Sequence, residues 1–394
     1  MNKIITELRI LVCGYSQDFY PRDETIMSGL RQLPFKQLID LRIRDGSWVK
    51  RRSGQKVTIN LKRRAKRRLC FNRLKIKALI ITGKVDLILA MIRNEDLALN
   101  ICRWAQRYGI PVIYDLFTSR YLAAQNKQEE LDFWRACEQK IVSLCSHCLT
   151  FTLPYKKFYE QTYGLSPERI SVVPLAVEDI WLDYPGQEKK QNQDTFIVAY
   201  WGNAHKHHGL DLAFEAAYLL RDLSIQFYFY GSIKLKEIIE KAIETKHLTN
   251  VSYRGFLPTT ESLVEAVDKA DLCFGHLALE LDAHLALPNK ALQGMARGKT
   301  VLHVDSPQLR NHYAGSDQEV APLYFFSGGA SGLAEAIRQL YHNPGLRVRI
   351  GRAARECVRQ NHSVDQVRTA VEEVICKAQK KDITLHIKNS RLNI

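Results

Sequence analysis

A turn between Gly202 and Gly209 joins an apolar run to a helical pattern, within the stretch "YWGNAHKHHGLDLAFEAAYLL". The backbone N–H groups at the start of a helix are unpaired and carry about half a positive charge, which suits a phosphate. Hydrogen-bond donors crowd the turn that leads to this helix start. They are Asn203, Lys206 and His208. We therefore expect this turn to hold an anion such as phosphate.

Two other interpretations of the turn stay open. It could be a solvated loop, or His205, His207 and His208 could bind zinc. A zinc site normally takes ligands from separate places in the fold, and no carboxylate or cysteine accompanies these histidines. Neither GxGxxG nor GxxxxGK[ST] is present at the turn. We predict phosphate contact without a metal ion.

A second candidate anion site begins at Pro288 and Asn289, which open a helical pattern. Lys290 lies in the first turn of that helix, where a cation opposes the macrodipole unless an anion also binds. Gln293 follows about one turn later on a similar face. The alternative is an ordinary surface lysine. Together, the two helix starts could grip a diphosphate between them.

Four further candidates lie near the carboxyl ends of expected strands, where ligands of open α/β sheets bind. Gly14 and Tyr15 would line the acceptor side of the site. Asp115 could orient or deprotonate an acceptor hydroxyl, or it could cap a turn. Arg254 could meet a phosphate or lie on the surface.

Buried strand patterns alternate with helical patterns along the 394 residues. This alternation predicts parallel sheets with right-handed crossovers. We expect an α/β protein with two Rossmann-like domains facing across a cleft. The predicted parts are an N-terminal domain over 1–183, a linker over 184–194, a second domain over 195–365, and a C-terminal helix and tail over 366–394 that packs back on the first domain.

The net charge of +15 comes from one segment, 42–84, which holds 16 Lys or Arg and the single acid Asp45. The rest of the chain has 57 − 16 = 41 basic and 42 − 1 = 41 acidic residues. Cations interleaved with apolar residues are typical of a helix at an anionic membrane surface. The predicted contacts are Arg63, Arg64, Arg67 and Arg68. A solvated basic loop is the alternative, and nucleic-acid binding is not expected because no recognition motif accompanies the charge.

Glu7 and Arg9 interrupt the N-terminal apolar stretch, and no apolar run approaches the length of a transmembrane helix. We expect a cytoplasmic protein that is peripheral on the inner face of a membrane. The nine cysteines form no framework. The Cys145-Ser-His147-Cys148 motif resembles half a zinc site, but no second pair follows, so we interpret it as core cysteines.

The second half of the chain resembles the donor-binding domain of family 4 glycosyltransferases of the GT-B fold. The segments that carry the resemblance are "WGNAHKHHGLDLAFEAA", "VSYRGFLP", "DLCFGHL", "LPNKALQGMARGKTVL" and "LYHNPGLRVRIGRAARECV". "DLILAMIRNEDLAL", "IPVIYDLF" and "ISVVPLAVEDIWL" resemble parts of the acceptor half. The resemblance covers nearly the whole chain and is weakest in the basic segment.

The resemblance implies a sugar nucleotide in the cleft, no bound metal or other cofactor, and usually retention of anomeric configuration. Most members place Lys-Gly where this chain has His208-Gly209, so either Lys206 or His208 is expected at the diphosphate. Backbone near Phe256 would cradle the base. The two glutamates that many members carry correspond here to Leu285 and Gln293. This chain is similar to the branch with a Pro-Asn-Lys turn, in which Asn289 and Lys290 face the phosphates.

The predicted function is transfer of a sugar from a UDP- or GDP-sugar to a glycan or lipid-linked acceptor, in the synthesis of a surface polysaccharide or glycolipid. Two alternatives remain. One is another GT-B enzyme, such as a sugar-nucleotide epimerase. The other is a non-catalytic subunit on the same fold, which the Leu285 departure keeps open.

Overall fold

The computed structural model describes most of the chain. The described residues are 5–16, 21–44, 71–91, 95–117, 121, 128–185, 195–203, 208–278, 284–313 and 320–391. For 15–16, 43–44, 128–129 and 380–391 this description covers the backbone alone. They form two compact units. Unit 1 comprises described residues up to 175 and again from 365, and unit 2 comprises those from 176 to 364.

Unit 1 is built on a six-stranded parallel sheet with the order β2-β1-β3-β4-β5-β6. Its inner strands are continuous apolar runs because helices cover both faces. The strands are β1 (Arg9–Ser16), β2 (Gln37–Arg44), β3 (Leu87–Met91), β4 (Val112–Asp115), β5 (His147–Thr150) and β6 (Ile170–Val172).

Helices connect these strands in the pattern of parallel α/β proteins. They are η1 (Ile5–Glu7), α1 (Pro21–Arg31), a helix over 71–81, α4 (Glu95–Arg107), α6 (Gln128–Leu144), α7 (Leu153–Tyr163), η2 (Pro167–Arg169) and the C-terminal α17 (Val364–Arg391). The last of these packs on unit 1. The Gln379 amide donates to the Asp86 carbonyl at 3.3 Å, and Gly29 of α1 lies tightly against the Arg368 backbone.

Unit 2 holds a second six-stranded parallel sheet, with the order β12-β11-β10-β7-β8-β9. The strands are β7 (Phe196–Gly202), β8 (Ile225–Gly231), β9 (Val251–Tyr253), β10 (Leu272–Phe274), β11 (Thr300–Val304) and β12 (Tyr324–Phe326). The core around this sheet is aliphatic and aromatic, with Phe214, Phe227, Phe229 and Phe274 fully buried.

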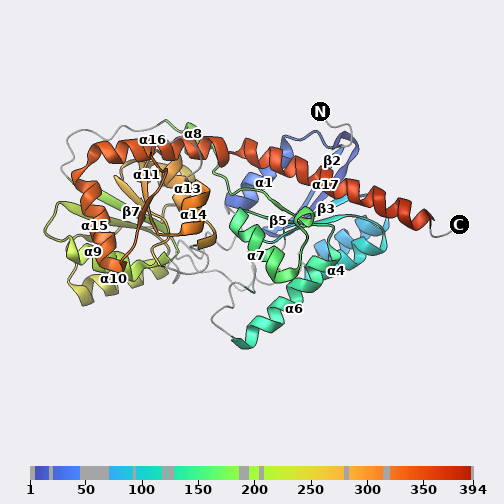
Figure 1. Ribbon diagram of the computed structural model, residues 1–394, viewed down its shortest axis with the longest axis horizontal. Helices are drawn as coiled ribbons and strands as arrows, with labels where there is room; N and C mark the ends of the chain where they lie inside the picture. The colour runs from blue at the N-terminus through green and yellow to red at the C-terminus, as the bar shows by residue number, and fades with distance from the viewer. Residues whose placement is uncertain are drawn as a thin grey trace. The chain divides into compact units, whose positions relative to one another are not determined.

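Helices lie on both sides of the second sheet, with α9, α10 and α15 on one side and α8, α11, α13 and α16 on the other (Figure 1). Their bounds are α8 (Asp179–Asp183), α9 (Leu210–Leu219), α10 (Ile233–Lys246), α11 (Thr260–Asp268), α13 (Asn289–Ala296), α14 (Pro307–Tyr313), α15 (Gly329–His342) and α16 (Pro344–Asn361). Arg297 ties α8 to this unit by pairing with Asp268 at 2.8 Å and donating to the Trp181 and Tyr184 carbonyls.

The predicted α/β class with two parallel sheets is confirmed. Within the described ranges, no helix combines the length and the apolar character needed to cross a membrane.

Candidate functional site

The second sheet reverses its strand order between β7 and β10, which are hydrogen-bonded neighbours. From β7 the chain passes through α9 to β8 on one side, and from β10 it passes through α13 to β11 on the other. Both helices therefore start at the carboxyl edge of the sheet, beside the switch point. Ligands of open α/β sheets bind in the crevice that forms there.

The turn after β7 is organised by a buried cluster of polar groups. The Tyr200 hydroxyl donates to the Asn203 carbonyl, and the His208 Nδ1 atom lies 2.6 Å from both of these oxygens. This cluster draws the two ends of the turn together and places His208 directly before the α9 N-terminus. The structure thus brings Gly202, Asn203, His208 and Gly209 to one place, whereas Lys206 lies outside the described residues.

Gly209 is the N-cap of α9 and has φ 65°. A Cβ atom added there would lie 2.6 Å from the Ala278 backbone nitrogen and 2.9 Å from the Leu277 carbonyl carbon. Only glycine combines the left-handed conformation with so close an approach. The start of α9 is thereby held against the backbone that follows β10.

Lys290, in the first turn of α13, is 6 % exposed. Its Nζ atom has no hydrogen-bond acceptor within the described structure and lies 4.1 Å from the centre of the Tyr200 ring. Burial lowers the pKa of this amine well below its ordinary value, because the ammonium form is desolvated. A buried amine without an acceptor costs stability, and an anion bound beside it would offset that cost.

Two neighbours of Lys290 on α13 carry amide side chains. The Oδ1 atom of Asn289 is buried and has no hydrogen-bond donor among the described residues. The side chain of Gln293 accepts a 2.8 Å bond from the Trp201 indole N–H at the end of β7. Pro288 is the N-cap and has an extended conformation. The four predicted residues therefore lie on α13 or directly before it, and Lys290 and Gln293 contact β7.

Histidines line the same edge of the sheet, and two of them, His276 and His303, were not among the predicted site residues. The rings of His208 and His276 are 5.6 Å apart, and those of His276 and His303 are also 5.6 Å apart. Burial lowers the pKa of His303 to about 4, and its Nδ1–H group donates to the Val304 carbonyl at 2.8 Å. A sequence signal was available, because each of these two histidines lies at or just beyond the end of a buried strand.

Arg254 and Phe256 lie farther along the sheet, after β9. The Arg254 guanidinium is exposed and stacks on the Tyr228 ring at 3.9 Å. Phe256 is half-buried in the following segment. The Gly231 N–H group donates to the Gly255 carbonyl at 3.0 Å, which joins the ends of β8 and β9. Leu285, at the position of the first family glutamate, is buried.

In unit 1, Asp115 ends β4 and is buried in an ion pair with Arg22 of α1. The Arg22 guanidinium donates to both carboxylate oxygens, at 3.0 and 2.7 Å, and also to the Val173 carbonyl at 2.9 Å. Phe117 lies on its face at 5.1 Å. The pair joins α1, β4 and the end of β6, so Asp115 has a structural role whether or not it also meets an acceptor.

Gly14 and Tyr15 lie in β1, next to β2 and β3, and Gly14 has φ 138°.

Cys145 and Cys148 are buried, with their sulfurs 3.4 Å apart, and the Nε2 atom of His147 bonds the Ser171 hydroxyl at 2.9 Å. Within the described part of the chain, no cluster of His, Cys, Asp and Glu could hold a metal ion. The four predicted membrane contacts, Arg63, Arg64, Arg67 and Arg68, lie outside the described residues.

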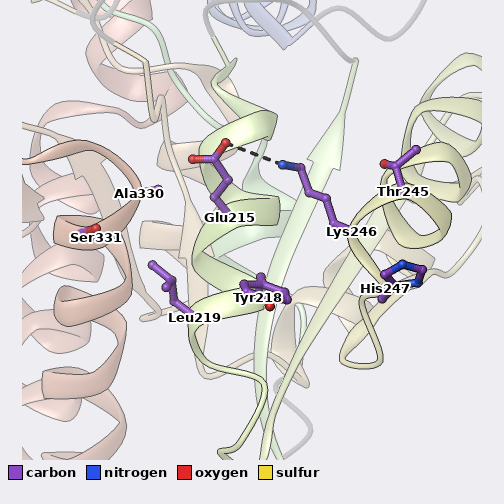
Figure 2. A pocket seen from close by; sticks show the side chains of 8 residues that line it. All are labelled: Glu215, Tyr218, Leu219, Thr245, Lys246, His247, Ala330 and Ser331. Atoms are coloured by element: carbon purple, nitrogen blue, oxygen red, sulfur yellow. Dashed lines mark ion pairs between the residues drawn. The ribbon is translucent and has the colours of Figure 1, made fainter.

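A hollow opens on another surface of unit 2, between α9, α10 and the start of α15. Figure 2 shows its lining, with Tyr218 and Leu219 from α9 and an ion pair of 3.6 Å between Lys246 and Glu215. The lining residues come from the later part of α9 and not from its N-terminus. This hollow is therefore separate from the candidate anion site.

Comparison with protein families gives one match, to a model described as "Glycosyl transferase-like", over residues 212–373. That range contains the start of α13 at Asn289, and it begins just after the start of α9 at Leu210. A search of curated proteins finds no match.

Among solved structures, Anabaena HepE in complex with UDP and glucose superposes with a TM-score of 0.70 at 13 % identity, covering 94 % of this chain and 100 % of that one. Sucrose-phosphate synthase from Thermosynechococcus elongatus gives 0.70 at 14 % identity, covering 95 % and 100 %. The lipopolysaccharide outer core galactosyltransferase WaaB gives 0.62 at 12 % identity, covering 93 % and 99 %.

These matches extend over nearly the whole chain and confirm the predicted GT-B fold. The prediction of a glycosyltransferase is confirmed by the glycosyltransferase-like domain over 212–373.

Proposed function

We propose that the protein transfers a sugar from a UDP-sugar to a glycan or lipid-linked acceptor, with the pyrophosphate held between the starts of α9 and α13. The observation that carries this proposal is Lys290, which is buried at a helix N-terminus and has no acceptor within the described structure. An incoming diphosphate would supply the missing anion. Its charge would also restore the protonated form of the amine, which burial disfavours.

The arrangement suits the chemistry of a leaving nucleotide diphosphate. Negative charge grows on the leaving group as the glycosidic bond breaks, and preorganised dipoles and cations stabilise it. The N–H groups at the starts of α9 and α13 supply the dipoles, and Lys290 supplies the cation. This scheme uses no metal ion. We further propose retention of configuration and membership of the family 4 branch with the Pro-Asn-Lys turn.

UDP is the donor class that the comparisons support best, because structures of the matched HepE hold UDP or UDP-glucose. GDP remains the alternative. Gln293 would contact the ribose, held in place by the Trp201 indole. Backbone near Phe256 and the Arg254 side chain would meet the base or a phosphate.

We propose that unit 1 binds the acceptor, with Gly14 and Tyr15 in the binding segment and Asp115 orienting the acceptor hydroxyl. A surface polysaccharide or glycolipid pathway at the cytoplasmic face of a membrane fits the basic segment. There Arg63, Arg64, Arg67 and Arg68 would contact anionic lipid.

Release of UDP tests the proposal. The purified protein is incubated with UDP-glucose, UDP-galactose and UDP-N-acetylglucosamine, and with the GDP-sugars, without an acceptor. Slow UDP release, absent in a Lys290→Met variant, is the expected result. Tight binding of UDP with no turnover in the presence of acceptor extracts would favour a non-catalytic subunit. Conversion of one UDP-sugar to its epimer would favour an epimerase.

A further inference from the structure

The helix over 71–81 in unit 1 has a buried face that fixes it to the sheet. Ile76 and Ile80 are fully buried. The Asn72 amide donates to the Leu41 carbonyl of β2 at 3.2 Å. These contacts determine which face of the helix turns away from the unit.

The opposite face is also apolar. Phe71, Leu74, Ala78 and Ile81 follow one another at spacings of three, four and three, which puts them in one stripe along the helix. Phe71 is 66 % exposed, Leu74 69 % and Ile81 46 %. The outward face of a helix on a soluble domain is normally polar, and an exposed apolar patch marks an interaction site.

Cations border this stripe on both sides. Lys75 and Lys77 are exposed, and the helical period places them on opposite flanks of the stripe. Lys77 and Arg73 also lie over the Trp104 ring of α4, at 5.6 and 5.8 Å. Residues 71–84 contain no Asp or Glu. The complementary surface must therefore be apolar in the middle and anionic on both sides.

We propose that the stripe of Phe71, Leu74, Ala78 and Ile81, with Lys75 and Lys77 beside it, docks on a bilayer surface that contains anionic lipid. A helix lying flat in the interface buries such a stripe among acyl chains, while the lysine stems reach outward to the lipid phosphates. A second copy of the chain would bring the same lysines together, and like charges repel. The inference deepens the proposed function by naming the membrane-docking surface of the acceptor unit. It rests on the proposed function for the reason why the protein would bind a membrane, and on the helix itself for the surface.

The test is co-sedimentation with vesicles of phosphatidylcholine, with and without phosphatidylglycerol. The stripe variant is Phe71→Ser/Leu74→Ser/Ile81→Ser. The matched control is Leu153→Ser/Ile233→Ser/Val348→Ser, which removes three apolar side chains of similar exposure elsewhere, at 51 %, 48 % and 59 %. A third variant, Lys75→Gln/Lys77→Gln, tests the charge. Thermal unfolding and UDP affinity are measured for each protein.

Wild-type protein and the control are expected to bind the phosphatidylglycerol vesicles, with binding that weakens as salt is added. The stripe variant is expected to lose at least tenfold in vesicle affinity, and the lysine variant to bind more weakly and with a smaller salt dependence than wild type. Stripe-variant binding equal to the control, or equal binding to pure phosphatidylcholine, overturns the proposal. So does a change in oligomeric state of the stripe variant without vesicles. Because UDP affinity is measured separately, loss of the donor site would be distinguished from loss of membrane docking.

Discussion

The Nζ atom of Lys290 lies over the ring of Tyr200, 4.1 Å from its centre, and the Tyr200 hydroxyl bonds the turn that leads to α9. One tyrosine thus contacts both predicted anion-binding segments, although they are about 80 residues apart in the sequence. A ring face compensates a buried ammonium only in part. The unliganded protein therefore carries a cost at this position that an anion would remove.

Replacing Lys290 by Met is expected to stabilise the unliganded protein. The side chain keeps its volume but no longer buries an amine without an acceptor, which typically costs about 1–3 kcal/mol. Chemical denaturation measures the free energy of unfolding. The control is Lys246→Met, since Lys246 is half-buried and paired with Glu215 at 3.6 Å. A Lys290→Met protein less stable than wild type would show that the amine has a partner in solution.

His303 is expected to make the protein sensitive to acid. Its pKa is about 4 in the folded state and about 6.5 when unfolded, so between these values the unfolded chain binds the extra proton. The contribution of His303 to the free energy of unfolding is fully present above pH 6.5. It falls by about 3 kcal/mol as the pH drops toward 4. Unfolding free energies of wild type and His303→Asn are compared from pH 7 to pH 4.

The Asn side chain can retain the bond to the Val304 carbonyl but does not titrate. The difference between His303→Asn and wild type should therefore shift in favour of the variant on acidification. The exposed His342→Asn variant controls for loss of one imidazole. Parallel curves for wild type and His303→Asn would contradict the assignment.

Gly209→Ala is expected to destabilise unit 2 and to weaken UDP binding. The matched control is Gly329→Ala, because Gly329 has nearly the same φ, 64°, but open space where its Cβ would lie. The control should lose about 1 kcal/mol from backbone conformation alone. Gly209→Ala adds a clash with the Leu277 and Ala278 backbone, so its loss should be larger. Equal losses of stability in the two variants, with UDP affinity intact, would show that the close approach at Gly209 affects neither stability nor binding.

Variants of the Arg22–Asp115 pair can distinguish a structural role of Asp115 from a catalytic one. Asp115→Leu alone leaves a buried guanidinium without its partner and is expected to cost about 3–5 kcal/mol, whereas Arg22→Met/Asp115→Leu should recover much of that loss. If Asp115 orients the acceptor, sugar transfer stays lost in the stable double variant. Recovered transfer would restrict Asp115 to holding α1 on β4.

The fold could be predicted because buried parallel strands are nearly continuous apolar runs, as in "FIVAYW" of β7. Lys290 could be selected as a candidate because a cation in the first turn of a helix is unfavourable without an anion. The sequence shows His276 and His303 near strand ends, but their row with His208 could not be predicted, since it depends on the spatial order β11-β10-β7. The partner of Asp115 was missed for a similar reason, because Arg22 lies 93 residues earlier.

The most direct test of the diphosphate site is a comparison of UDP and uridine binding by calorimetry, in wild type and in Lys290→Met. Wild type should bind UDP far more tightly than uridine, and Lys290→Met should lose most of that difference while its uridine affinity is unchanged. If Lys290→Met weakens UDP and uridine binding equally, or leaves both unchanged, the starts of α9 and α13 do not hold the pyrophosphate.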